Sequence, residues 1–424
     1  MAFDAEPLQP TITSETPASR PSARPPLNLG EGRRSDLDWL RVIAFGLLIL
    51  FHVGLVYAPF DWHLHSRYTA DWLREGVLVT GPWRLSLLFF ISGAALKLMS
   101  RRHTPGAVVK ARLARLVPPF LFGVALLVPP QAYFESIDKG LWHAGPIAWW
   151  AHEFSPEGVA AGIPLNHLWF VLYILVYSLL ATALVALPRL QERLSAGLGR
   201  ILSGPAILIA PIAYLAAARV GLFPTFGISN HLSSDWYNHA SAFAVFLLGF
   251  LVVGEPGFWR ATIRWRWLAL AIAAVTLPVL MALASTQSTA PEPWWASVAF
   301  AADQWACVAA ILGFGALHLQ NKDGPALRYL AQAVFPCYLA HQTILVCSVW
   351  LVRPLNLPAF VEPPILIAMT IGGCLALYEV VRRINLIRPL WGLKPLPRRV
   401  VEAAPVLRPT PVAAKSPALT AEAA

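Results

Sequence analysis

Two ionisable residues in the first long apolar segment have types and spacing that could support chemistry. Arg41 and His52 lie within residues 38–58, with ten residues between them. If this segment is an α-helix, the eleven steps make almost three turns, so both side chains share one face about 16 Å apart along the axis. Asp38 lies three residues before Arg41 and can pair with its guanidinium. The spacing predicts one helix that carries a charge near one membrane surface and a histidine in the opposite half.

His52 is the candidate catalytic residue and Arg41 the candidate for positioning a substrate. An unperturbed imidazole, with a pKa of about 6.5, suits a general base that takes a proton from an attacking hydroxyl. A covalent acyl-histidine fits the same residue type, and the spacing does not separate the two routes. Arg41 could instead extend to the lipid headgroups, and His52 could be a hydrogen-bonded core residue. Their shared helix face favours a joint function.

The elements that must position these residues are membrane-spanning helices. The chain has 424 residues, of which 57% are hydrophobic and 13% charged, too few polar groups to cover a water-soluble globule. We expect an all-α integral membrane protein, a bundle of about ten transmembrane helices. The sixth segment is short and the ninth contains Pro336. The segments are 38–58, 76–99, 113–134, 166–187, 203–222, 239–254, 265–284, 297–318, 329–351 and 362–383.

The distribution of basic residues predicts the orientation of the bundle. Lys and Arg gather at the N-terminus and in every second connection, for example between Lys97 and Arg115, whereas the other connections hold few. The positive-inside rule then places both termini in the cytoplasm. Residues 1–34 and 397–424 are expected to be disordered cytoplasmic tails, because the proline-rich N-terminal segment shows no apolar periodicity. Residues 35–396 form the predicted transmembrane domain.

Charge and cysteine content exclude several other classes. The net charge of +10 comes from residues between apolar segments, so it reports membrane topology and predicts no nucleic-acid partner. The four cysteines form no CxxC pair and lie in or beside apolar segments. We therefore expect neither a disulfide framework nor a metal site.

Several short segments, together with the Arg41–His52 spacing, match the sequence pattern of one protein family. The chain resembles the acyltransferase-3 family, bacterial membrane proteins that acylate carbohydrates and whose first helix carries an arginine, ten residues and a histidine. The resemblance implies an O-acyltransferase that uses acyl-CoA as donor substrate, a carbohydrate as acceptor and no bound cofactor. The similar segments are Phe89–Gly93 (FFISG), Arg112–Pro118 (RLARLVP), Asn166–Phe170 (NHLWF) and Tyr338–Gln342 (YLAHQ).

A narrower likeness concerns the substrate. Trp62–Ser66 (WHLHS) and Leu377–Glu379 (LYE) are similar to a branch of the family that is presumed to succinylate periplasmic glucans. This implies a protein of the bacterial inner membrane that modifies a periplasmic or cell-surface glycan. Acetyl and succinyl groups both remain possible.

Basic residues before the third segment are candidates for binding the donor. Arg112 and Arg115, together with Arg101 and Arg102, would form a basic inner mouth, and arginine forks suit the phosphate oxygens of CoA. The competing interpretation is that they only anchor the topology.

Other candidates come from the remaining family-like segments. His167 and His341 could orient the acceptor or complete a proton path, and Trp62 and His63 could bind the acceptor, although an interfacial aromatic belt also explains outer tryptophans. Ser92 is a supporting residue only, because no G-x-S-x-G motif surrounds it.

The small residues Ser92 and Gly93 are expected to let the second helix approach the first closely. A rival class is a transporter or proton-coupled carrier in which Arg41 and His52 relay protons. An inactive membrane scaffold would leave this ionisable pair unexplained.

Overall fold

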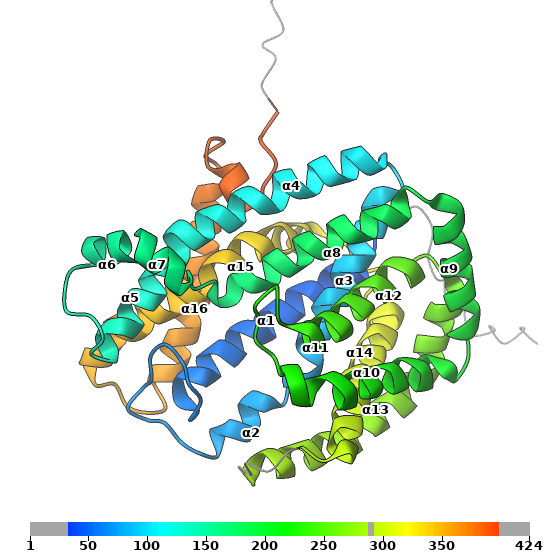
Figure 1. Cartoon of the computed structure of the whole chain (residues 1–424), viewed down its shortest axis with the longest axis horizontal. Coiled ribbons are helices and arrows are strands. Elements are labelled where there is room, and N and C mark those ends of the chain that lie inside the picture. The colour runs from blue at the N-terminus through cyan, green and yellow to red at the C-terminus, as the bar shows by residue number, and fades with distance from the viewer. Residues whose placement is uncertain (1–32, 287–291, 398–424) are drawn as a thin grey trace, which may run out of the picture.

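The computed structural model describes residues 33–286 and 292–397, and these residues form helices joined by short connections (Figure 1). Both predicted tails lie almost entirely outside the described residues. Arg34, at the edge of the predicted N-terminal tail, is buried against Trp259, with 4.0 Å between its guanidinium carbon and the ring centroid. The elements are α1(Ser35–Tyr57), α2(Leu73–Leu78), α3(Gly81–Ser100), α4(Pro105–Phe122), η1(Gly123–Leu127), α5(Val128–Asp138), α6(Pro146–Glu153), α7(Pro156–Ala161), η2(Asn166–Leu168), α8(Trp169–Val185), α9(Pro188–Ile201), α10(Ala206–Phe226), α11(Trp236–Asn238), η3(His239–Phe243), α12(Ala244–Val252), α13(Pro256–Ser285), α14(Trp294–His318), α15(Pro325–Val352), η4(Arg353–Leu355), α16(Glu362–Val381) and η5(Arg388–Trp391).

Within the described residues, nine helical segments are long and apolar enough to cross a membrane. They agree with nine of the ten predicted segments. The exception is the sixth, where the apolar helix Trp236–Val252 is shorter than the others. It contains a π-helical turn, η3, and packs along α3 inside the bundle.

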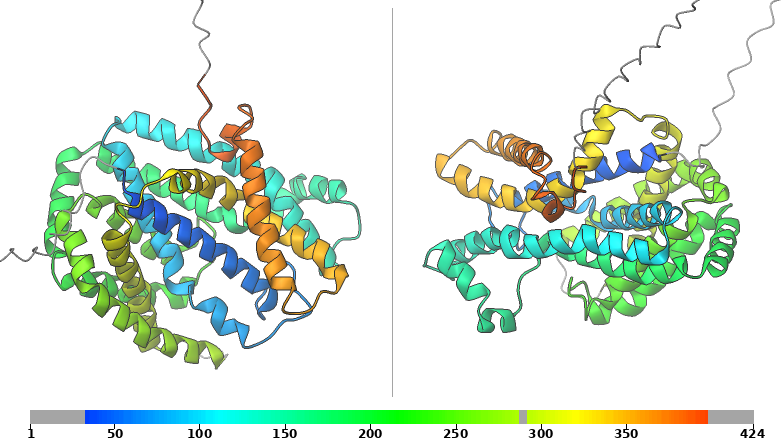
Figure 2. Two further views of the ribbon diagram at one scale, coloured as in Figure 1. Left: turned by 180° about the vertical axis from the view of Figure 1, so that it is seen from behind. Right: turned by 90° about the horizontal axis from the view of Figure 1, so that it is seen from above.

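The connections separate into two ends of the bundle. At the first, which we call the arginine end, Trp39 Nε1 donates to the carbonyl of Lys322 at 2.8 Å. At the second, the loop end, Arg67 donates to Asn356 at 2.6 Å and Lys139 to Asp61 at 3.2 Å. Both described chain ends lie at the arginine end (Figures 1 and 2). Nine crossings would place them at opposite ends, so the shorter helix Trp236–Val252 must also run from one end of the bundle to the other.

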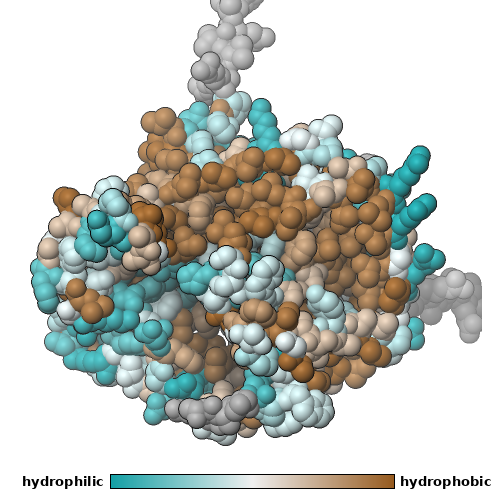
Figure 3. All heavy atoms as spheres, viewed as in Figure 1, coloured by the Kyte–Doolittle hydropathy of each residue, from teal (hydrophilic) through white to brown (hydrophobic). Residues whose placement is uncertain are grey.

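The surface between the two ends is apolar. Figure 3 shows a broad hydrophobic area with hydrophilic groups gathered at the left and right of the view. Exposed large apolar side chains come from several long helices, for example Leu121, Leu180, Ile209, Val275 and Leu351. A continuous apolar surface of this kind fits lipid tails, so the chain is a multi-pass membrane protein.

Two glycines bring α3 and α12 into close contact. A Cβ atom on Gly93 would lie 1.8 Å from the carbonyl oxygen of Phe246, and one on Gly249 would lie 2.1 Å from that of Phe90. Neither position can therefore carry a side chain without separating the helices. The expectation that Gly93 serves an approach to the first helix was wrong, since the close partner is α12.

Two prolines shape the junction between η1 and α5. Pro129 and Pro130 lack the N–H groups that would bond the carbonyl of Ala125 in an α-helical or π-helical turn. Trp150 Nε1 donates to this carbonyl instead, at 2.8 Å. The neighbouring carbonyl of Leu127 accepts from Gln131 at 3.0 Å and from Thr343 on α15 at 2.6 Å. The irregular turn thus ties α5 to α15 beside the candidate site.

Candidate active site

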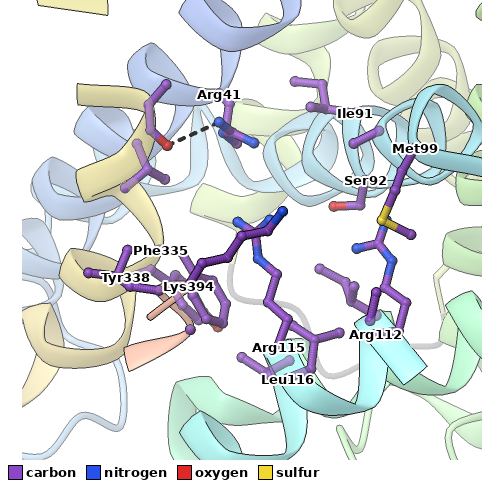
Figure 4. A pocket seen from close by; sticks show the side chains of 18 of the residues that line it. Arg41, Ile91, Ser92, Met99, Arg112, Arg115, Leu116, Phe335, Tyr338 and Lys394 are labelled. Atoms are coloured by element: carbon purple, nitrogen blue, oxygen red, sulfur yellow. Dashed lines mark hydrogen bonds between the residues drawn. The ribbon is translucent and has the colours of Figure 1, made fainter. Parts of the chain in front are cut away.

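A cavity of about 630 Å³ opens at the arginine end between α1, α3, α4, α8 and α15. We call it the deep cavity. Arg41, Arg112 and Arg115 point into it from α1 and α4, the Lys394 side chain extends beside Arg115, and Ser92 lines it from α3 (Figure 4). The structure therefore brings four predicted residues from three segments, Arg41, Ser92, Arg112 and Arg115, to one space, with apolar side chains such as Leu48, Ile91 and Phe170 around them.

Arg41 is held in place by partners on two helices. Its Nη2 donates to Asp38 Oδ1 at 3.0 Å, the predicted pair, and to the carbonyl of Ala331 on α15 at 3.1 Å. That carbonyl lies beside the carbonyl of Gln332, which Pro336 cannot bond because proline has no N–H. Arg41 therefore stabilises the turn of α15 that the proline interrupts while its guanidinium still lines the deep cavity.

Arg112 and Arg115 differ from Arg41 because no described carboxylate pairs with either of them. They stand one turn apart on α4 and face the same cavity. A second cavity of about 780 Å³, the basic cavity, adjoins the first and shares Arg41 and His103 with it. Arg33, Arg34, Arg101 and Arg102 line it. The arginine end thus offers cations to an anionic ligand next to a deep apolar space.

Ser92 lines the deep cavity, but its hydroxyl is already hydrogen-bonded within its own helix. Its hydroxyl donates to the carbonyl of Leu88 one turn earlier at 2.7 Å. This is the usual arrangement of a serine in a membrane helix, and neither His52 nor His341 contacts it. Its position suits contact with a ligand rather than attack on one.

His52 lies outside the deep cavity, in a cluster of histidines nearer the loop end. His52 Nδ1 is 3.1 Å from His341 Nε2, and the ring centroids of His341 and His167 are 5.1 Å apart. His52 is 8% exposed and His341 is fully buried. Arg41 and His52 both contact α15, as a shared face of α1 requires. We refer to His52, His167, His341 and the neighbouring His63 as the histidine cluster.

The hydrogen bonds of the cluster determine where the protons lie. His341 Nδ1 is 2.6 Å from the carbonyl of Tyr338, which can only accept, so this nitrogen carries the proton. In a neutral ring, which deep burial favours, His341 Nε2 is then an acceptor, and His52 Nδ1 must donate to it. His52 Nε2 therefore holds the lone pair, and the structure gives it no hydrogen-bond partner among the residues it describes.

His167 is fixed in the same manner. Its Nε2 donates to the carbonyl of Leu339 at 3.1 Å, and Tyr338 donates its hydroxyl to the carbonyl of His167. The remaining nitrogen, Nδ1, is buried with no partner among the described residues. His167 thus presents an unpaired acceptor beside His341.

Trp62 and His63, the predicted acceptor-binding residues, close the cluster from the loop after α1. The Trp62 ring stacks on His52 with 5.3 Å between centroids, and its Nε1 is buried without a partner among the described residues. His63 Nδ1 donates to Glu135 at 2.5 Å, and its Nε2 accepts from Gln342 at 2.6 Å. Trp62 can thus donate to an incoming hydroxyl, whereas both His63 nitrogens are already bonded.

Sequence reasoning missed several members of this site. Glu135 and Gln342 hold His63, and Tyr338 orients both His341 and His167. Glu135 also accepts from Lys139 at 2.7 Å, which raises the pKa of that lysine. A carboxylate directly after the apolar segment 113–134 was the available signal for Glu135.

An apolar layer separates the deep cavity from the histidine cluster. The cavity reaches Phe45, Leu48 and Tyr338, but neither His52 nor His341 lines it. Phe45 packs its ring against the edge of His341, with 5.7 Å between centroids. A donor that enters at the arginine end must pass this layer to meet His52 Nε2.

The fold and this arrangement describe a membrane-embedded protein with an arginine-lined cavity and a buried histidine cluster. Residues 34–379 match the family model described as an acyltransferase domain, Acyl_transf_3. The chain belongs to this acyltransferase-3 family, as the resemblance indicated, and is an O-acyltransferase.

Curated relatives give a more specific likeness. The chain is 24% identical over 400 residues to the glucans biosynthesis protein C of Escherichia coli K12, a match that covers 88% of this chain and 98% of the relative. The proteins of the same name from Escherichia coli O81 (strain ED1a) and O6:K15:H31 (strain 536) match with the same identity and coverage. No solved structure matches the chain significantly.

Proposed function

We propose that the protein transfers an acyl group, acetyl or succinyl, from a cytoplasmic acyl-CoA to a hydroxyl of a periplasmic or cell-surface glycan. The observation that carries the proposal is the free lone pair of His52 Nε2 on the helix that also presents Arg41 to the deep cavity. The name of the glucan-related relatives supports a glycan acceptor, and the bacterial inner membrane is the proposed location.

The donor would enter at the arginine end. The phosphates of CoA suit Arg112, Arg115 and the basic cavity, because a guanidinium can bind phosphate oxygens with two parallel hydrogen bonds. The thin pantetheine arm suits the apolar part of the deep cavity, which ends at Leu48 and Tyr338. A small movement of this layer would bring the thioester to His52.

The transfer can then take either of two balanced routes. In the first, His52 Nε2 takes the proton of the acceptor hydroxyl, whose oxygen attacks the thioester carbonyl, and the proton passes to the departing CoA thiolate. In the second, Nε2 attacks the thioester carbonyl and CoA leaves as the thiolate. The acceptor hydroxyl then cleaves the resulting acyl-imidazolium, which restores neutral His52, and the proton of that hydroxyl passes to the CoA thiolate. In both, His341 accepts the Nδ1 hydrogen bond and stabilises the imidazolium.

Mass spectrometry of envelope glycans from cells with and without the chain tests this function. An acyl group on a glycan that disappears with the gene and returns with it is the expected result. Purified protein should also release CoA from acyl-CoA over many turnovers only when the glycan is present. Movement of an intact substrate across vesicle membranes without acylation would contradict the proposal and favour the transporter.

The proposal also requires the arginine end to face the cytoplasm. Reporter fusions after Arg115, Arg193 and Arg266 should read cytoplasmic, and fusions near Asp61, Trp149 and Trp294 should read external. An external signal after Arg115 would reverse the orientation and remove cytoplasmic acyl-CoA as the donor.

A further inference from the structure

A buried arginine lies next to the histidine cluster and takes no part in the mechanism above. Arg84, in the first turn of α3 near the loop end, is 4% exposed. Its guanidinium carbon lies 3.7 Å from the centroid of the Phe51 ring. Phe51 in turn packs against His52, with 5.2 Å between ring centroids. The Phe51 ring therefore contacts both the Arg84 cation and the imidazole of the catalytic candidate.

The hydrogen bonds of Arg84 are incomplete. Its Nη1 donates to Thr80 Oγ1 at 2.6 Å. Its Nε is buried, and neither Nε nor Nη2 has a partner among the described residues. A guanidinium has five N–H donors, so most of its capacity is unused. Burying a charged guanidinium with unused donors costs free energy unless an anion accepts the remaining hydrogen bonds.

Two other buried arginines in this structure have carboxylate partners. Arg34, 7% exposed, pairs with Asp36 at 2.6 and 2.9 Å. Arg219, 6% exposed, pairs with Glu292 at 2.6 and 2.9 Å and lies 3.7 Å from the ring centroid of Phe300. Each binds one carboxylate through two nitrogens, as a guanidinium prefers. Arg84 has the aromatic contact of Arg219 without a described carboxylate.

We propose that Arg84 binds a carboxylate of a substrate held at His52 and makes the enzyme selective for that substrate. The inference rests on the proposed acyl transfer. The carboxylate has two possible sources: the far end of a dicarboxylic acyl group on the donor, or an acidic substituent on the acceptor. In a four-carbon dicarboxylic acyl chain, three bonds of about 1.5 Å each separate the carboxyl carbons by roughly 4 Å. A chain of this length suits two groups, Arg84 and His52, that contact the same aromatic ring.

Donor selectivity of the purified protein tests the first source. Succinyl-CoA and butyryl-CoA carry acyl chains of equal length, and only succinyl ends in a carboxylate. For Arg84→Met we expect kcat/KM with succinyl-CoA to fall about 10- to 100-fold, the size expected for losing a charge-assisted hydrogen bond, while the butyryl value changes little. Arg84→Lys should retain part of the succinyl preference, because it keeps the charge but not the planar fork.

A neighbouring arginine provides the matched control. Arg74 on α2 also lies over an aromatic ring, 5.0 Å from the centroid of Phe60, and donates to the carbonyl of Pro59. Arg74→Met removes one positive charge from the same end of the bundle. It should leave the succinyl-to-butyryl ratio unchanged, which separates direct binding from general attraction of anions.

The second source is tested with butyryl-CoA and two acceptors, a neutral glucan and one carrying acidic substituents. A loss confined to the acidic acceptor in Arg84→Met would assign the carboxylate to the acceptor. An equal loss of kcat/KM with every donor and acceptor, or no loss with any of them, would overturn the inference. Arg84 would then have only a structural role.

Binding of succinate alone keeps the inference distinct from the proposed function. Calorimetric titration of wild-type protein should show binding that Arg84→Met loses and Arg74→Met keeps. A protein that binds succinate through Arg84 but acylates nothing would refute the acyl transfer, not the anion site. If the protein transfers acyl groups but Arg84→Met changes selectivity neither between the two donors nor between the two acceptors, the anion site is refuted. The proposed acyl transfer would then still stand.

Discussion

The deep cavity and the histidine cluster lie along the same helix but are built in opposite ways. The deep cavity is roomy, and Arg112 and Arg115 extend into it without a described carboxylate partner. The histidine cluster is densely packed, and a chain of hydrogen bonds from the Tyr338 carbonyl through His341 fixes the proton on His52. The first arrangement suits binding of a large anionic ligand, and the second suits one defined proton position.

This contrast predicts different kinetic consequences in the two regions. Changes in the histidine cluster should lower kcat, because they disturb groups that act in the transition state. Changes among the cavity arginines should mainly raise KM for the donor. The largest losses of activity are therefore expected in the histidine cluster and the smallest at the edge of the deep cavity.

Replacing His52 should have the largest effect. His52→Ala removes the nitrogen with the free lone pair, so transfer should fall by about 10² to 10⁴, and further if the acyl-histidine route operates. Turnover at saturating donor and acceptor in membranes measures the loss. His231→Ala, at an exposed histidine near the loop end, is the control and should be active. Wild-type turnover by His52→Ala would make the first helix purely structural.

Replacing His341 should have the next largest effect, although this residue is expected to act through His52. His341→Ala leaves His52 Nδ1 without its acceptor, so kcat should fall roughly 10- to 100-fold, part of what acid–base catalysis supplies, with little change in KM. His341→Gln offers a side-chain oxygen in its place and should recover part of kcat. Equal activity of the Ala and Gln variants would show that the hydrogen bond to His52 has no function.

The double variant Arg112→Gln/Arg115→Gln tests the other region. If Arg112 and Arg115 bind the CoA phosphates as proposed, losing both should raise the KM for acyl-CoA on the order of 10-fold or more, with a smaller fall in kcat. Steady-state kinetics with varied acyl-CoA measures both constants. An unchanged KM at normal expression would leave these arginines as topology anchors and remove the functional contrast.

Arg41→Lys should have a smaller effect, because the charge remains and only the fork is lost. Lysine cannot readily span both Asp38 and the Ala331 carbonyl in the geometry that Arg41 uses. We expect activity to fall by roughly 3- to 10-fold, equivalent to about 1 kcal/mol, the value of a typical hydrogen bond. Full activity of the lysine variant would indicate that Arg41 serves only as a membrane-surface cation.

Features that depend on local periodicity could be predicted from the sequence. The 3.6-residue repeat placed Arg41, Asp38 and His52 on one face of α1, and hydropathy located nine helices long enough to span. The orientation toward the cytoplasm and the roles of these residues stay predictions. The sixth segment, already short in the sequence at 239–254, corresponds to the apolar helix Trp236–Val252, which is shorter than the nine spanning helices of the described residues.

Contacts between distant segments could not be read in the same way. His52 and His341 meet although they are 289 positions apart, and nothing in either segment specifies the partner. Gly93 signalled a close approach without showing that α12 would make it. Arg84 offered a usable signal, a charge inside an apolar segment, yet its lack of a described carboxylate partner is visible only after folding.

Ser92→Ala should have the smallest effect and tests the division between the regions most directly. Ser92 lies in the deep cavity, where a thioester must pass, and a serine hydroxyl is a common nucleophile. Its hydroxyl, however, is donated to the Leu88 carbonyl, and no described histidine contacts it to remove its proton. We therefore expect kcat to change less than about 2-fold, since alanine packs in the same space and the bond to Leu88 contributes only about 1 kcal/mol to stability. Quenched-flow analysis with labelled acyl-CoA should find no acyl group on this residue. Loss of turnover in a well-inserted Ser92→Ala protein would move the chemistry into the cavity and leave the histidine cluster to bind the acceptor.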